Sequence, residues 1–336
     1  MRQAHIHNRR YLGNKQSLSE FITSTVNDNC TDIEVVADIF SGTGAVANMF
    51  KDSKVVITND LLYCNYISHC AWFLPQAYNK EKVGALIAKY NDICTSEDNY
   101  MRKNFADTFY SADICSKIGY IRQNIEDSHT AQEINFKEYS ILITALLYGM
   151  DRVANTVGHY DAYRKNAAYD LGFIVPLILP DPNNQKNQCF NRDANVLAGE
   201  IECDLLYLDP PYNSRQYSDA YHLLENIAKW EKPEVFGIAR KMDRTDIKSH
   251  YCTTKAVGAF TDLIEKAHAK YIMLSYNNIS EKGNSRSNAR LSDDDIMRVL
   301  EAKGEVKVFE TKHKAFSTGK GNLPDNAERL FLCRVR

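Results

Sequence analysis

Two short β-type runs lie close together near the start of the chain, and the segment between them has the character of a helix. The first run, Glu34 to Phe40 (EVVADIF), ends at a Ser-Gly-Thr-Gly turn that leads into the helix-compatible stretch Ala45 to Phe50. The second run, Lys54 to Thr58 (KVVIT), ends at Asn59 and Asp60. Strands joined through a crossover helix pair in parallel. The region therefore predicts the beginning of a parallel α/β sheet.

The remaining strand signals come much later in the chain. They occur at residues 204–208, 271–275, 305–310 and 329–335, with helical segments between them. The stretch after Pro75 instead carries helical spacing at residues 82–90, 114–125 and 137–155, followed by a segment rich in Gly, Asn, Pro and Tyr at 157–188. We predict a doubly wound, mostly parallel, Rossmann-like sheet from residues 1–76 and 189–336, with a helical insertion at residues 77–188.

Composition narrows the class of protein. No apolar run approaches the roughly 18 residues that a membrane-spanning helix needs, and the first ten residues lack a signal peptide's apolar block, so we expect a cytoplasmic protein without membrane partners. The nine cysteines include no C-x2-C pair, and no metal site is predicted. The net charge of -2 gives no overall sign of nucleic-acid binding. Basic clusters at residues 1–15 and 237–256 are either phosphate contacts or solvated faces.

The turn after the first strand run has the residues of a ligand-binding strand end. Open α/β sheets bind ligands at the carboxyl ends of their strands, where Asp38, Phe40, Gly42 and Gly44 are expected to lie. Glycines let the backbone turn tightly and approach a ligand. The turn lacks the third glycine and the Lys-Ser/Thr pair of phosphate-binding loops, which disfavours a dinucleotide or a triphosphate. Asp60 is placed to bind ribose hydroxyls, with a strand-end cap as the alternative.

The strongest signal is the sequence Asp209-Pro210-Pro211-Tyr212, which follows an apolar strand run directly. Two successive prolines make the strand exit rigid and leave backbone carbonyls free to accept hydrogen bonds. Such acceptors suit an exocyclic amine, because hydrogen bonds to the Asp209 carboxylate and the Pro210 carbonyl draw its nitrogen toward a nucleophilic, tetrahedral geometry. Tyr212 is suited to stack on an extruded base. The alternative is a plain turn after a buried strand.

Taken in chain order, these residues resemble the alpha-group (D12 class) N6-adenine-specific DNA methyltransferases, which include deoxyadenosine methylases and the modification enzymes of type II restriction systems. The segment Arg10 to Lys15 is similar to the family's aromatic-to-lysine motif. Asp193 matches the acid that contacts the cofactor's adenine amine. The resemblance implies a methyltransferase fold with S-adenosylmethionine as cofactor, held by Tyr11, Lys15, Asp38, Phe40, Gly42, Gly44, Asp60, Asp193 and Asp209.

The resemblance also implies where DNA binds. The family's target-recognition domain lies where the insertion at 77–188 is found, although that insertion holds 12 Lys and Arg against 14 Asp and Glu. Residues 152–164 resemble its DNA-facing part, and residues 217–222 resemble the segment that closes over a flipped base. Residues 275–277 are similar to a motif near the target pocket, and residues 320–331 are similar to a terminal hairpin. The implied substrate-binding residues are Arg152, His159, Tyr160, Arg164, Tyr217, Tyr221, His222 and Asn277.

The implied activity is methylation of adenine N6 in double-stranded DNA after base flipping, with Asp209, Pro210, Pro211 and Tyr212 as catalytic residues. The enzyme would be an orphan methylase or would act beside a restriction endonuclease encoded separately. Alternatives stay open: an RNA adenine-N6 or guanine-N2 methyltransferase, a lower-ranked N4-cytosine methyltransferase, and a non-catalytic DNA-binding module. Each of these residues also has a plain alternative when it is considered alone. Lys15 could be a surface charge, Asp193 could cap a helix, and Tyr217 to Tyr221 could form an ordinary helix face.

Overall fold

The computed structural model describes residues 3–9, 11–13, 15–181, 183–277, 290–312 and 327–336. The chain divides into two compact units. The first, here called the helical unit, comprises residues 1–14, 62–185 and 218–246. The second, here called the sheet unit, comprises residues 15–61, 186–217 and 247–336. This division differs from the expected one, because the N-terminal segment, the helix after β2 and a stretch beyond the Pro-Pro turn all join the helical unit.

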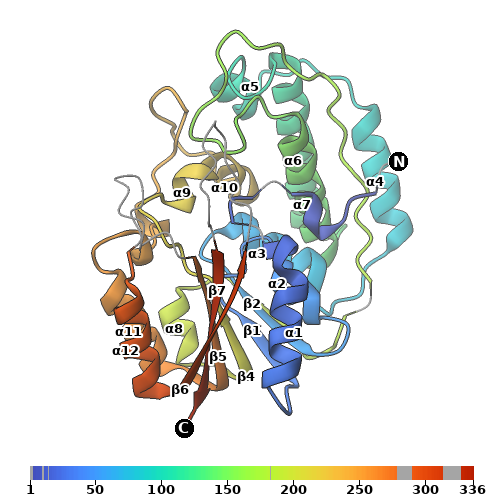
Figure 1. The fold of residues 1–336 in the computed structure, drawn as a ribbon. Helices are drawn as coiled ribbons and strands as arrows, with labels where there is room; N and C mark the ends of the chain where they lie inside the picture. The colour runs from blue at the N-terminus through green and yellow to red at the C-terminus, as the bar shows by residue number, and fades with distance from the viewer. Residues whose placement is uncertain (1–2, 10, 14, 182, 278–289, 313–326) are drawn as a thin grey trace. The chain divides into compact units, whose positions relative to one another are not determined.

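The sheet unit is built on seven strands in the order β3-β2-β1-β4-β5-β7-β6 (Figure 1). Strands β1 to β5 pair in parallel, and β7 runs antiparallel to both of its neighbours, so the predicted mostly parallel sheet is confirmed. The strand-type runs in the sequence predicted every one of these strands except the short β3. The strands are β1 (Val35–Asp38), β2 (Val55–Asn59), β3 (Gln188–Phe190), β4 (Glu202–Leu208), β5 (His268–Asn277), β6 (Gly304–Lys312) and β7 (Ala327–Val335).

Helices cover both faces of this sheet, as the doubly wound prediction requires. Figure 1 shows α1 (Ser19–Asn29) and α2 (Ala45–Phe50) on one face. The other face carries α8 (Ala194–Ala198), α11 (Ala256–Lys266) and α12 (Asp293–Lys303), whose apolar residues share one buried core with β1, β4 and β5. Ser292 caps the N-terminus of α12, because its hydroxyl accepts the Asp295 N–H.

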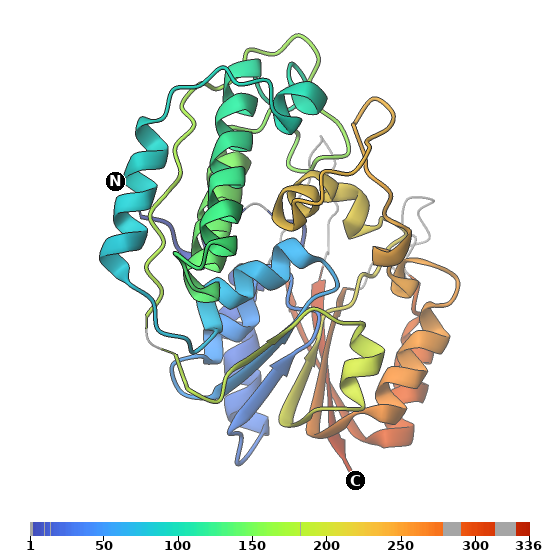
Figure 2. The ribbon, with the colours of Figure 1, turned by 180° about the vertical axis from the view of Figure 1, so that it is seen from behind.

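The helical unit is built around one long helix, α7 (Phe136–Val153), whose residues are buried on almost every side. Its neighbours include α3 (Tyr63–Phe73), α4 (Lys80–Asp92), α6 (Ala112–Thr130) and α10 (His222–Lys229) (Figure 2). The predicted helical spacing is confirmed for α4, α6 and α7, but the six-residue helix α5 (Tyr100–Phe105) was missed. The short helix α9 (Tyr217–Ala220) precedes α10. None of the helices in the described ranges combines the length and apolarity needed to span a membrane.

Candidate active site

A buried lysine and two carboxylates meet where β4, β5 and β7 end or begin. Lys15 Nζ lies 3.1 Å from Asp209 Oδ1, directly after β4, and 2.6 Å from Glu328 Oε1, near the start of β7. The Ser275 hydroxyl of β5 donates to the same Glu328 oxygen at 2.9 Å. Lys15 and Glu328 are buried, and the Asp209 side chain is 19% exposed. Lys15 is therefore a member of this cluster rather than a surface charge.

The pKa values in this cluster follow from burial and from the charges on neighbouring groups. Burial raises the pKa of Asp209 to about 6, with the Lys15 ammonium opposing the rise and the Glu328 charge adding to it. Burial by itself would lower the pKa of Lys15, but the charges of Asp209 and Glu328 raise that pKa well above its usual range. At neutral pH the site therefore presents an ionised Asp209 carboxylate beside a positively charged lysine.

The glycine turn after β1 is braced by the acid that follows β2. Gly42 and Gly44 have φ values of 52° and 81°, a backbone region that favours glycine. The Gly42 N–H donates to Asp60 Oδ2 at 2.9 Å. Asp60 therefore stabilises the turn, while its expected role toward a ribose stays a prediction.

Asp38, the last residue of β1, is buried, and its Oδ1 has no hydrogen-bond partner among the described residues. Burial raises the pKa of Asp38 well above its usual range, and the nearby charges of Asp209 and Asp60 raise it further. Phe40 packs edge-on against Tyr251, with ring centroids 5.1 Å apart. A buried carboxyl oxygen without a partner is what a donor group or positive charge on a bound ligand would satisfy.

The turn that ends at Tyr212 is held by Tyr276, near the end of β5, and by the segment before α12. The Tyr276 hydroxyl donates to the Tyr212 carbonyl at 3.3 Å, and the Arg290 N–H donates to the same oxygen at 3.1 Å. The Leu291 N–H in turn donates to the Tyr276 hydroxyl at 3.2 Å. The Pro210 carbonyl receives no hydrogen bond from the described residues. The turn is therefore fixed in place while one of its carbonyls stays available.

Two other predicted residues of the sheet unit have structural contacts. Asp193 caps α8, because its Oδ1 accepts the N–H groups of Asn195 and Val196 at 2.9 and 3.2 Å. This is the helix cap that the sequence left open as an alternative, and the contact with a cofactor stays a prediction. Asn277 ends β5 and is buried, and its carbonyl accepts from Arg329 at 3.1 Å. Tyr217 is the half-buried first residue of α9.

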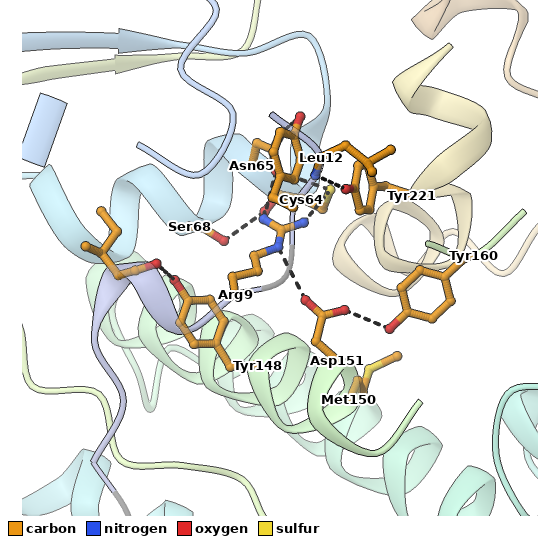
Figure 3. Close-up of polar contacts among 12 residues, drawn as sticks. Arg9, Leu12, Cys64, Asn65, Ser68, Tyr148, Met150, Asp151, Tyr160 and Tyr221 are labelled. Atoms are coloured by element: carbon orange, nitrogen blue, oxygen red, sulfur yellow. Dashed lines mark hydrogen bonds and ion pairs between the residues drawn. The ribbon is translucent and has the colours of Figure 1, made fainter. Parts of the chain in front are cut away.

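Within the helical unit, a buried guanidinium ties the N-terminal segment to α3 and α7 (Figure 3). Arg9 donates to Asn65 Oδ1 at 2.7 Å, and its Nε lies 3.7 Å from Asp151 Oδ2. The Tyr160 hydroxyl donates to the other Asp151 oxygen at 2.8 Å. The Tyr148 hydroxyl donates to the Ile6 carbonyl at 3.0 Å, which anchors the same N-terminal segment a second time.

The same network positions Tyr11, a predicted cofactor contact, against Tyr221, a predicted substrate contact. Their rings are stacked, with centroids 4.6 Å apart and planes 11° apart. Asn65 donates to the Tyr11 hydroxyl at 3.1 Å, and the Leu12 N–H donates to the Tyr221 hydroxyl at 2.7 Å. The hydroxyl and one ring face of Tyr221 are therefore already engaged. Tyr221 is buried, so in this conformation it supports Tyr11.

Tyr160 and His222, two predicted substrate contacts, are buried inside the helical unit. The Tyr160 N–H donates to the Ala220 carbonyl at 2.7 Å, and His222 Nε2 lies 2.9 Å from the Tyr160 carbonyl. Burial lowers the pKa of His222 to about 4, so its ring is neutral. The structure therefore gives both residues a packing role between segment 155–164 and α10. Of the other predicted contacts in residues 152–164, Arg152 and Arg164 are exposed, and partly buried His159 lies 3.5 Å from Asp161.

Sequence reasoning assigned no role to Glu328 or Tyr276, although both belong to runs that carried the resemblance. The only available signals were an acid at the start of the last strand and a tyrosine between Ser275 and Asn277. Their partners are 313 and 64 residues away, and no local pattern specifies such pairs. The part of the predicted terminal hairpin at residues 320–326 lies outside the described residues. No cluster of metal-binding side chains occurs in the described part of the chain.

Comparison with known proteins gives one family for this arrangement. Residues 11–287 match the family described as "D12 class N6 adenine-specific DNA methyltransferase". This range contains the predicted motifs from Tyr11 to Asn277, so the resemblance inferred from them is confirmed.

Similar curated proteins include three bacterial methylases. "Modification methylase StsI" of Streptococcus sanguinis is 35% identical over 80% of this chain and 44% of its own length. "Type II methyltransferase M.FokI" of Planomicrobium okeanokoites is 32% identical over 96% of this chain and 51% of its own length. "Type II methyltransferase M.NlaIII" of Neisseria lactamica is 30% identical over 92% of this chain and 93% of its own length. The chain thus spans about half of the first two relatives and nearly all of the third.

Proposed function

Because the chain belongs to the D12 class N6 adenine-specific DNA methyltransferase family, we propose that it methylates the N6 amine of adenine in double-stranded DNA. The observation that carries the proposal is the cluster at the end of β4, where the ionised Asp209 carboxylate precedes a rigid Pro-Pro-Tyr turn. An RNA methyltransferase acting on adenine N6 or guanine N2 remains the alternative for the same turn.

Each group in the turn has a separate task in this proposal. The Asp209 carboxylate and the free Pro210 carbonyl accept the two amine N–H bonds, which localises the nitrogen lone pair for attack. Pro211 keeps these acceptors fixed, and Tyr212 offers a ring on which the flipped adenine stacks. Lys15 holds one Asp209 oxygen at 3.1 Å, so the carboxylate cannot rotate away. No covalent nucleophile is required, because the amine itself attacks.

The sheet unit also fits S-adenosylmethionine, which supplies the methyl group when it is bound. The unpartnered Asp38 oxygen, the close approach allowed by Gly42 and Gly44, and the carboxylates of Asp60 and Asp209 make an acidic strand end suited to a cationic ligand with hydroxyls. The residues of the sheet unit proposed to bind it are Lys15, Asp38, Phe40, Gly42, Gly44, Asp60, Asp193 and Asp209.

The biological role follows from the printed names of the relatives, which are modification methylases and type II methyltransferases. We infer that the protein protects DNA in a restriction-modification system or acts as an orphan methylase, in the cytoplasm where that DNA lies. A restriction endonuclease encoded separately is the proposed partner. The helical unit, which contains most of residues 77–188, is the proposed target-recognition part.

A tritiated-methyl assay on plasmid DNA, RNA and free nucleosides, followed by nucleoside identification, tests the proposal. We expect N6-methyladenine in DNA. Asp209→Ala should keep cofactor binding in calorimetry and lose transfer, while Asp52→Ala, at an exposed site, should stay active. Label in RNA adenine or guanine would support the RNA alternative, and a fully active Asp209→Ala would refute the assignment. Absence of cofactor heat would favour a non-catalytic binding module.

A further inference from the structure

The helical unit carries a tight hairpin after α10, whose residues from Gly237 onward begin the basic cluster noted at residues 237–256. Phe236 and Lys241 pair through two backbone hydrogen bonds of 2.8 and 2.9 Å, and the Arg240 N–H donates to the Gly237 carbonyl at 3.2 Å. Gly237 and Arg240 have φ values of 70° and 52°. Figures 1 and 2 show this light-orange loop projecting outward from the segment that follows α10. Its closed backbone gives the tip a defined shape.

The hairpin exposes two large apolar side chains, one in its closing pair and one in its turn. Phe236 is 58% exposed and Ile238 is 75% exposed. Single exposed apolar residues are ordinary, but two on one short closed hairpin form a small hydrophobic projection. Because the hairpin is closed by its own backbone bonds, exposure of these side chains is built into its conformation.

The charges around this tip point to a polyanion. Arg240 is exposed and forms no side-chain hydrogen bond or ion pair with the described residues. No acidic residue lies between Val235 and Met242. The insertion at residues 77–188, by contrast, has more acidic than basic residues. A basic contact outside that insertion supplies charge that a DNA-binding surface needs and the insertion lacks.

The base of the hairpin is tied to the two segments that the family resemblance assigns to DNA. Lys241 Nζ lies 2.7 Å from Asp161, in segment 152–164, and 3.5 Å from Asp219, in segment 217–222. Arg244 Nε lies 2.8 Å from the same Asp219 oxygen. These ion pairs neutralise Lys241 and Arg244, so Arg240 is the cation of the hairpin left to meet a phosphate.

We propose that this hairpin is a DNA wedge, in which Phe236 and Ile238 insert between base pairs while Arg240 contacts the adjacent backbone. Apolar side chains that enter a duplex partly unstack base steps and kink the helix, and Phe and Ile are among the residues that do so. Unstacking lowers the cost of extruding a base nearby. The inference rests on the proposed function and adds to it a duplex-contacting element outside residues 77–188.

Fluorescence anisotropy and end-to-end energy transfer on labelled plasmid-derived duplexes, with cofactor present, test the wedge. The double variant Phe236→Ala/Ile238→Ala should bind duplex about tenfold more weakly and lose the bending signal, a loss that corresponds to about 1.4 kcal/mol. Phe236→Leu/Ile238→Leu should restore both, because leucine also wedges. Arg240→Ala should lower the slope of log affinity against log salt by about one. Val308→Ala, 48% exposed in β6, is the matched apolar control and should match the wild type.

Two results would overturn the wedge: wild-type duplex binding and bending by the alanine double variant, or an equal loss in the Val308 control. Unchanged DNA binding with lost association to a co-encoded nuclease would make the hairpin a protein-docking site instead. Cofactor calorimetry and thermal melting of each variant show whether it is folded. Methylation is scored separately, so a wild type that binds and bends duplex but transfers no methyl group to DNA would refute the proposed function and leave the wedge standing.

Discussion

Replacing the carboxylate of Asp209, the proposed catalytic group, with its amide should stabilise the protein above neutral pH while removing activity. Burial raises the pKa of Asp209 from its ordinary 3.8 to about 6. Between these two values the folded chain holds a proton that the unfolded chain has lost. The free energy of unfolding therefore falls as pH rises through this window. Above about pH 6 the ionised side chain costs the folded state about 3 kcal/mol.

The Asp209→Asn variant removes this cost, since its amide is nearly isosteric with the protonated acid and carries no charge. Its stability advantage over the wild type should grow by about 1.5 kcal/mol between pH 5 and pH 8. Its methyl transfer should fall at least about a hundredfold, because a neutral amide polarises the amine less than a carboxylate does. Asp52→Asn removes the same net charge at an exposed site, so the difference between the two variants isolates the effect of burial.

The assay must report on the sheet unit. Both tryptophans, Trp72 and Trp230, lie in the helical unit, so their fluorescence does not follow the strand that carries Asp209. Hydrogen exchange of the β4 amides measures the opening free energy there directly. The stability advantage of Asp209→Asn could instead stay constant from pH 5 to pH 8, or become a loss of stability at high pH. Either result would refute the conclusion that burial raises the pKa of Asp209 and that its ionised form destabilises the folded state.

Three further predictions concern the neighbours of this site and the N-terminal anchor. Lys15→Met should raise the pKa of Asp209, because the ammonium that lowers it is gone, and should move the acid limb of kcat/KM to higher pH; an unmoved limb would contradict this. Glu328→Gln should move the acid limb to lower pH, because the charge of Glu328 raises the pKa of Asp209. A shift to higher pH, as expected for Lys15→Met, would show that the limb does not report the titration of Asp209. Arg9→Met should destabilise the helical unit by about 3 kcal/mol in urea unfolding, since the buried Asp151 carboxylate loses the neighbouring guanidinium charge. Adding Asp151→Asn should recover part of that loss.

The fold was predictable to the extent that local patterns determine it. Apolar runs that end at the Gly42 turn and before Asp209 specify buried parallel strands, and the structure contains β1 and β4 there. The six-residue α5 was missed because it spans fewer than two turns and therefore shows little periodicity. The three-residue β3 was missed because only β2 gives it a partner. The division into units depends on packing of α3 and α10 against α7, which is long-range information.

The candidate site was predictable where residue type alone reports chemistry. Glycines with positive φ, an acid at a strand end and a Pro-Pro turn each signal their conformation locally, and Gly42, Gly44 and Asp209 lie as expected. The burial of Tyr160 and His222 was not predictable, because neither residue type shows from the local sequence whether its side chain faces solvent or packs inside the protein. The Ala220 and Tyr160 carbonyls that pair the two segments have no side-chain signature.

The direction of β7 explains why a third charged residue belongs to this site. In a sheet of parallel strands, the residues at the carboxyl edge come only from strand ends, as Asp209 and Ser275 do. Because β7 runs antiparallel to β5, its beginning reaches that same edge, and Glu328 lies opposite Asn277. Lys15 thus has two carboxylates as partners, and the second one makes the ammonium harder to deprotonate. A parallel seventh strand would place Arg334 or Val335 there instead, and Lys15 would face Asp209 alone.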